Sequence, residues 1–269
     1  MISARMIVAR FTCAAALIVC LGSSAFAASP REKMFCEDRN ADADLKISTC
    51  TAVIKTENDK PLLVVAYHQR GMSYFRKDMH NEAIADYNES LKLDPKYAFA
   101  WGGRALAFQA KGDLDKALSD YNQLIALYPE SSDYYLMRGF FFHQTKDWDK
   151  AIADFTKVIA LKPDRFDAFH RRGTAYSRKG DKTKALADLD TAISMGTNNA
   201  FAYAERADIR NDRGDTAGAL ADLDKSIQLN PEISSVYAMR SMVQRKLGNE
   251  AKAAEDRAEA IRRGFKYNN

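Results

Sequence analysis

The sequence predicts an all-α protein, a solenoid in which copies of one helix-turn-helix pattern are stacked end to end. The first observation is a period of 34 residues that recurs in register. Its six copies span about 64–97, 98–131, 132–165, 166–199, 200–233 and 234–267. The second observation is that apolar residues within each copy recur at helical spacing on both sides of a central break. Such a period indicates repeats that pack on their neighbours and share one core.

The first 27 residues have the three parts of a secretory signal peptide. Two arginines make a basic start, residues 11–21 are an apolar run, and residues 25–27 read Ala-Phe-Ala, a small-x-small cleavage site. The apolar run is shorter than the roughly 20 residues that a transmembrane helix needs. We therefore expect cleavage after Ala27 and an exported protein, periplasmic or secreted, that keeps no stable membrane span.

Residues 28–60 are expected to form an N-terminal helical hairpin that caps the stack. They read as helices over about 31–39 and 44–57, separated by a turn at 40–42. Cys36 and Cys50 are the two cysteines that remain after cleavage, and an isolated pair in an oxidising compartment favours a disulfide. Closing this loop stabilises the fold by roughly 3 kcal/mol in the chain-entropy model. Two free buried thiols are the alternative.

Four positions of the pattern are filled alike in all six copies. An aromatic residue stands at Tyr67, Trp101, Tyr135, Phe169, Tyr203 and Tyr237, and an arginine at Arg70, Arg104, Arg138, Arg172, Arg206 and Arg240. The other two are an alanine, at Ala83, Ala117, Ala151, Ala185, Ala219 and Ala253, and an aspartate, at Asp86, Asp120, Asp154, Asp188, Asp222 and Asp256. Their regularity indicates positions that build the stack.

Each copy is predicted to contain two helices. Four copies have a central glycine followed by aspartate or asparagine, at Gly112, Gly180, Gly214 and Gly248. Glycine ends a helix in the left-handed conformation, and a short oxygen-bearing side chain caps the next one. Four copies close with a proline, which cannot continue a helix, at Pro95, Pro129, Pro163 and Pro231.

This pattern resembles the tetratricopeptide repeat family. The third copy carries the family's aromatic, glycine, alanine and proline positions at Tyr135, Gly139, Phe142, Ala151, Phe155 and Pro163. The resemblance covers about 63–266 and implies a right-handed α-solenoid whose first helices line a concave groove. The sequence departs from the family where the leucine of its Leu-Gly pair is arginine in every copy, and where the glycine is replaced at Ala105, Ala207 and Ser241.

Arg138 and Asp154 exemplify the arginine and aspartate that all copies share. We interpret them as a structural pair, because the arginine falls on the first helix of the copy and the aspartate on the second. A guanidinium can hold a carboxylate through two parallel hydrogen bonds, which would fix the register of the helices.

The resemblance implies that a partner contacts the exposed side of the first helices. The predicted groove residues are apolar in the first three copies, apart from His143, and polar in the next two: Met72, Phe75, Phe99, Leu106, Leu136, Phe140, His143, His170, Arg171 and Asp208. An apolar stripe at helical spacing is also typical of a core, so packing against neighbouring helices is the alternative for each of them.

The sequence favours a non-enzymatic scaffold or adaptor that binds another exported protein in this groove. Removing two arginines with the signal peptide leaves 40 − 2 = 38 basic and 36 acidic residues, a balance that does not favour a nucleic-acid partner. Phosphate-binding loops, metal-ligand spacings and nucleophile motifs are missing from the sequence, so we expect no catalytic residues, no metal and no cofactor. The alternative is a protein that binds a small ligand or a cell-envelope polymer through the aromatic groove; self-association through an end repeat is a further possibility.

Overall fold

The computed structural model describes residues 28–38 and 42–267, and all its regular secondary structure is helical. The predicted signal peptide, and residues 39–41 with most of the predicted first turn, lie outside the described residues. The helices are α1 (Pro30–Glu37), α2 (Ala43–Thr56), α3 (Lys60–Arg76), α4 (His80–Leu93), α5 (Ala98–Ala110), α6 (Leu114–Leu127), α7 (Ser132–Gln144), α8 (Trp148–Leu161), α9 (Phe166–Lys179), α10 (Lys182–Ser194), α11 (Ala200–Asp212), α12 (Thr216–Leu229), α13 (Ser234–Lys246) and α14 (Glu250–Arg262). In this part of the chain, each helix is too short or too polar to cross a bilayer.

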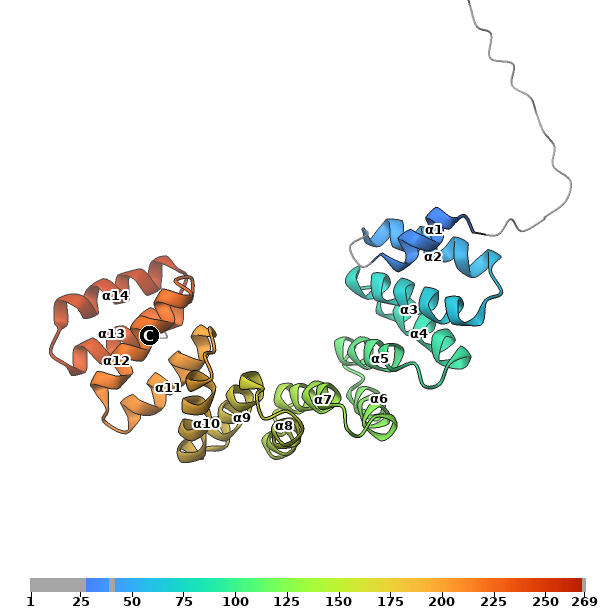
Figure 1. Ribbon diagram of the computed structural model, residues 1–269. Coiled ribbons are helices and arrows are strands. Elements are labelled where there is room, and N and C mark those ends of the chain that lie inside the picture. Colours follow the sequence, from blue (N-terminus) through green and yellow to red (C-terminus); the bar gives the residue numbers. More distant parts are fainter. Residues whose placement is uncertain (1–27, 39–41, 268–269) are drawn as a thin grey trace, which may run out of the picture.

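The helices form a curved stack in which each helix packs against the next one in the sequence (Figure 1). From α3 to α14 they make six pairs, one for each copy of the pattern. The hairpin of α1 and α2 packs on α3 at one end of the stack, and α13 and α14 lie at the other. The prediction of an all-α solenoid is confirmed.

The turn inside each copy depends on one residue in the left-handed region. Four copies use glycine, with φ of 81°, 93°, 85° and 78° at Gly112, Gly180, Gly214 and Gly248. The first and third copies have no glycine there, and Asp78 and Lys146 take φ of 58° and 62° instead. The next helix is capped by a side chain in three copies, where Asp147, Asp181 and Asp215 each accept a backbone N–H from the first turn.

The shared alanines lie where the two helices of each copy meet. All six are at most 2% exposed. Close packing also explains the glycine of the third copy, because a Cβ at Gly139 would come within 2.7 Å of Cε1 of Phe155. Small residues on the first helix therefore make room for a large side chain on the second.

The shared arginine and aspartate form the same bidentate pair in every copy. The Nε and Nη2 atoms of the arginine donate to the two carboxylate oxygens at 2.6–2.9 Å. The aspartates are 3–6% exposed. The shared aromatic residue supports the arginine, as Tyr135 does with its ring centroid 5.9 Å from Cζ of Arg138.

The arginine also reaches the preceding pair of helices. Its Nη1 atom donates to a side-chain oxygen there, and the acceptors along the stack are Thr51, Asn88, Asn122, Thr156, Asp190 and Asp224. Five of these acceptors stand two residues after a shared aspartate, whereas the same place in the sixth copy is Ala258. Each arginine thus joins its own copy to the one before; we call this arrangement the arginine clamp.

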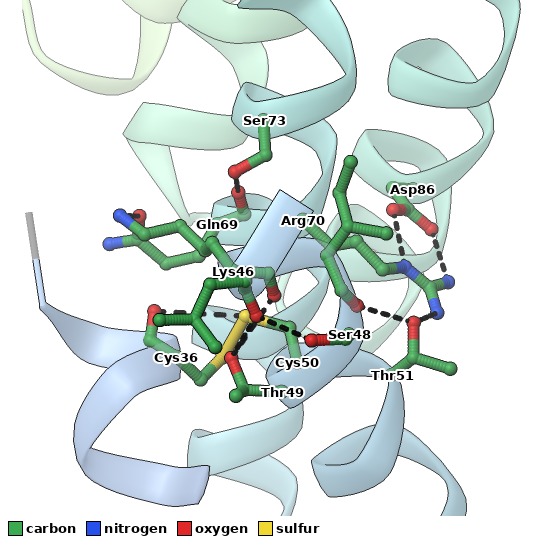
Figure 2. Close-up of a disulfide and its surroundings, with 12 residues drawn as sticks. Cys36, Lys46, Ser48, Thr49, Cys50, Thr51, Gln69, Arg70, Ser73 and Asp86 are labelled. Carbon is green, nitrogen blue, oxygen red and sulfur yellow. Dashed lines mark hydrogen bonds and ion pairs between the residues drawn. A yellow bond between two sulfur atoms is a disulfide. The ribbon is translucent and has the colours of Figure 1, made fainter. Parts of the chain in front are cut away.

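The N-terminal hairpin is tied together by a disulfide between Cys36 and Cys50, which are both fully buried (Figure 2). Their Cα atoms are 4.9 Å apart. Figure 2 also shows the first arginine clamp, with Arg70 between Thr51 of α2 and Asp86 of α4. Lys46 of α2 is fully buried as well, and burial lowers the pKa of its ammonium group.

Candidate partner-binding groove

A groove of 500 Å³ lies between α3, α5 and α7, the first helices of copies one to three. Its walls include four predicted residues, Met72, Phe75, Phe99 and Leu106, together with His68 and Met137. We call these six residues the apolar site. Phe99 is 66% exposed and Leu106 is 42% exposed. Large apolar side chains that are gathered in a concave surface and left exposed are typical of an interaction site.

The floor of the apolar site is formed by glycines of α5. A Cβ at Gly102 would lie 3.2 Å from Cε of Met137, so a side chain there would crowd the groove. A Cβ at Gly103 would come within 2.5 Å of Cζ of Tyr87. The first glycine keeps the floor open, and the second lets the Tyr87 ring pack beneath it.

His68 contributes an uncharged ring to the apolar site at neutral pH. Burial, and secondarily the charge of Lys46, lowers the pKa of His68 to about 4. Its ring centroid lies 5.4 Å from that of Tyr97 and 5.8 Å from that of Phe99. These walls of the site are therefore aromatic and aliphatic. Asp133 of α7 also lines the groove, and its carboxylate is paired with Arg165.

Three other predicted residues are partly buried within the stack. Leu136 and Phe140 pack against the core around α5 to α8. The guanidinium of Arg171 also lies over the Phe140 ring, with its Cζ atom 5.0 Å from the ring centroid. His143 makes an edge-to-face contact with Trp148, with the ring centroids 5.1 Å apart. These residues do not line the apolar site.

His170 is a correction to the sequence-based expectation of an exposed groove position. It is 3% exposed, because α11 and the loop before it close over its ring. Its Nδ1 atom lies 3.2 Å from Nδ2 of Asn199, and its Nε2 atom lies 3.3 Å from Oε2 of Glu205. The side chain therefore holds neighbouring copies together and offers no open surface to a partner.

A second groove, of 320 Å³, lies between α9, α11 and α13 of copies four to six. It includes one predicted residue, Asp208, together with five that the sequence analysis missed: Thr174, Arg178, Phe201, Glu205 and Met239. We call these six residues the acidic site. Partial burial, and secondarily Asp212, raises the pKa of Asp208. Phe201 is 53% exposed.

The described residues contain no group of three or more histidine, cysteine, aspartate or glutamate side chains placed to hold a metal ion. Two polar residues of the acidic site, Thr174 and Glu205, instead hold one another. The Thr174 hydroxyl lies 2.6 Å from Oε2 of Glu205. The site offers hydrogen bonds and charge, and its geometry fits recognition of another molecule.

A curved stack of paired antiparallel helices with open sites along its first helices defines an α-solenoid interaction scaffold. Models of the tetratricopeptide repeat match residues 64–97, 103–166 and 170–233. The chain belongs to the tetratricopeptide repeat family. Proteins of this family bind other proteins, and the repeat is generally a non-enzymatic scaffold.

Solved structures share this fold at low sequence identity. A structure of PilF from Pseudomonas aeruginosa has a TM-score of 0.67 and 18% identity, covering 76% of this chain and 93% of that one. PilW, a type IV pilus biogenesis factor, has a TM-score of 0.65 and 24% identity, covering 79% and 96%. YrrB, described as having an unusual peptide-binding site, has a TM-score of 0.54 and 18% identity, covering 66% and 92%. The comparison with curated proteins found no match.

Proposed function

We propose that this chain is an exported, non-enzymatic adaptor that holds a segment of another protein in the groove of its first helices. The observation that carries the proposal is the exposure of Phe99, at 66%, and Leu106, at 42%, in the apolar site. Both side chains stand on α5 and face a groove that two further first helices enclose. A segment that covered them would remove apolar surface from water.

An extended or helical segment fits such a groove when it carries apolar side chains that serve as anchors. The apolar site has no formal charge on its six residues once His68 is neutral. We therefore expect uncharged aliphatic or aromatic anchors. YrrB, whose fold is similar, is described as having a peptide-binding site, which is consistent with a segment as the ligand.

The test is photo-crosslinking in the exported protein, with the crosslinker placed at two different positions of the second copy. A benzoylphenylalanine placed at Leu106 on α5 should form a specific adduct with a partner protein. The same group placed at Lys116, on the second helix of the same copy, should not. Equal crosslinking from both positions would contradict binding in the groove.

A small ligand is the second candidate, because 500 Å³ lies within the range of roughly 300–1,000 Å³ that is common for small-molecule sites. Native mass spectrometry of the protein purified from the exported fraction separates the two functions. A retained non-protein mass that is lost in Phe99→Ala would support the small ligand. A stoichiometric protein partner would support the adaptor.

Export can be tested independently of binding. N-terminal sequencing of the protein recovered from outside the cytoplasm should begin at Ala28. Recovery of the chain with Met1 intact would contradict cleavage of residues 1–27 as a signal peptide.

A further inference from the structure

The apolar site and the acidic site occupy equivalent places three copies apart. Three periods of 34 residues are 102 residues, and this shift carries one site onto the other. Phe99 corresponds to Phe201, Leu106 to Asp208, and Met137 to Met239. The same elements enclose both, since α3, α5 and α7 become α9, α11 and α13. The molecule therefore presents one groove geometry twice.

The chemistry of the two sites differs at the matched positions. Met72 and Leu106 in the first become Thr174 and Asp208 in the second. The phenylalanine of the central helix and the methionine of the third helix are kept, so each site retains an aromatic ring and an aliphatic wall. The second site replaces the remaining apolar surface with hydroxyl and carboxylate groups.

The carboxylates of the acidic site are placed to receive a cation. Glu205 is held by Thr174, whose hydroxyl lies 2.6 Å from Oε2, and Nε2 of His170 lies 3.3 Å from the same oxygen. Asp208 has no hydrogen bond or ion pair within the described part of the chain. Its neighbour Asp212 is already paired with Lys182. An unpaired carboxylate beside a second carboxylate creates a local negative potential that a cationic ligand would relieve.

Phe201 makes the acidic site suited to a cation that carries an aliphatic stem. The face of an exposed aromatic ring attracts an ammonium or guanidinium group, and Phe201 is 53% exposed. Met239 provides apolar surface for the methylene groups of such a side chain. Lysine and arginine combine a charged end with a stem of this kind.

We propose that the acidic site binds the side chain of a lysine or arginine in the partner segment, between Phe201 and the carboxylates of Glu205 and Asp208. The assignment of this side chain to a partner segment rests on the proposed function; the affinity of the site for a cationic side chain does not. The partner segment is then bipartite, with uncharged apolar anchors for copies one to three and a basic residue for copies four to six.

Arg178 is the cation on the wall of the acidic site, and it would attract an acidic side chain. The two carboxylates outnumber it, so the formal charge of the six residues is −1. The proposal therefore predicts a preference for cations over anions, which small probes can measure directly.

The probes are N-acetyl-arginine amide, the neutral N-acetyl-citrulline amide, which has nearly the same shape, and N-acetyl-aspartate amide. Each is titrated into the full mature protein while the amide resonances of Ala204 and Glu205 are followed by NMR. The arginine probe should bind about tenfold more tightly than the citrulline probe, because charge-assisted hydrogen bonds are lost in the latter. Raising the salt concentration should weaken the binding of the arginine probe but not that of the neutral citrulline probe.

Two variants make the assignment specific. Asp208→Leu introduces the residue that the apolar site has at the matched position, Leu106. This variant should lose the preference for arginine over citrulline. Glu255→Gln, on the exposed surface of α14, removes a carboxylate elsewhere and should leave the preference unchanged. Circular dichroism checks that each variant keeps its helices.

Equal binding of the arginine and citrulline probes would overturn the proposal, and so would tighter binding of the aspartate probe through Arg178. An unchanged preference in Asp208→Leu would overturn it as well. Because these probes report on the acidic site by itself, failure of the crosslinking from Leu106 would leave their result intact. The two failures are thus distinguishable.

Discussion

Arg138 on α7 and Asp154 on α8 are joined by two parallel hydrogen bonds of 2.9 and 2.7 Å, and the guanidinium also donates to Asn122 of the preceding copy at 2.7 Å. One side chain thereby fixes two interfaces, the one within its copy and the one between copies. The hydrogen bonds to Asp154 raise the pKa of Arg138, which favours its charged form.

Removing one member of this pair should be worse than removing both. Asp154→Ala leaves the guanidinium, which is 21% exposed, without its carboxylate, and should lower stability by about 3 kcal/mol. The double variant Arg138→Met with Asp154→Leu replaces the pair by apolar groups and should lose less. Calorimetry gives both melting temperatures, and a lower value for the double variant would contradict this interpretation.

The bond between copies should have a smaller effect. Asn122→Ala removes the acceptor of Nη1 and should reduce the free energy of unfolding by about 1 kcal/mol. Ala258→Asn is the matched control. It places an asparagine at the equivalent position of the sixth copy, where no clamp arginine follows among the described residues. Urea unfolding should show a loss for the first variant and no gain for the second.

Reduction of the disulfide should loosen one end of the stack. Loss of the Cys36–Cys50 bond should lower stability by about 3 kcal/mol, with the effect concentrated in α1 and α2. Hydrogen exchange of the Cys36→Ser, Cys50→Ser variant should rise in these two helices and stay low in α7 to α12. A uniform rise along the chain would show that the hairpin is not an independent cap.

The pKa of His68 predicts a loss of stability in acid. His68 has a pKa of about 4 in the folded protein against 6.5 for an unperturbed histidine, so the unfolded chain binds more protons between these values. Stability from this group is therefore complete above pH 6.5 and falls as the pH is lowered toward 4, by up to about 3 kcal/mol. His68→Phe should remove this part of the pH dependence of urea unfolding; the same slope in the variant would contradict it.

Much of the fold could be predicted because the pattern of the two helices recurs in six copies. Ala151, Asp154 and their equivalents are buried in every copy, and Gly180 stands in a turn. The clamp between copies was missed, although the sequence carries a signal for it. A polar residue stands two places after the shared aspartate in copies one to five, as Asn122 does after Asp120, and that regularity could have indicated a contact.

The sites were harder to predict, because exposure depends on how closely neighbouring copies approach. His68 and His170 hold equivalent positions, yet one lines a groove and the other is 3% exposed beneath α11. The acidic site was missed for a related reason. Phe201 and Glu205 can be recognised as site residues by comparison with Phe99 and Gly103, three copies earlier. The sequence of a single copy does not provide that comparison.

The repetition of the groove at Phe99 and Phe201 sets a minimum length for any segment that reaches both sites. Three steps from one first helix to the next, at about 8–10 Å each, span roughly 25–30 Å. An extended peptide covers that distance with about eight or nine residues, and a helical one needs about eighteen. A peptide of five residues could fill either site alone, so affinity should rise sharply once the peptide is long enough for its two ends to bind together.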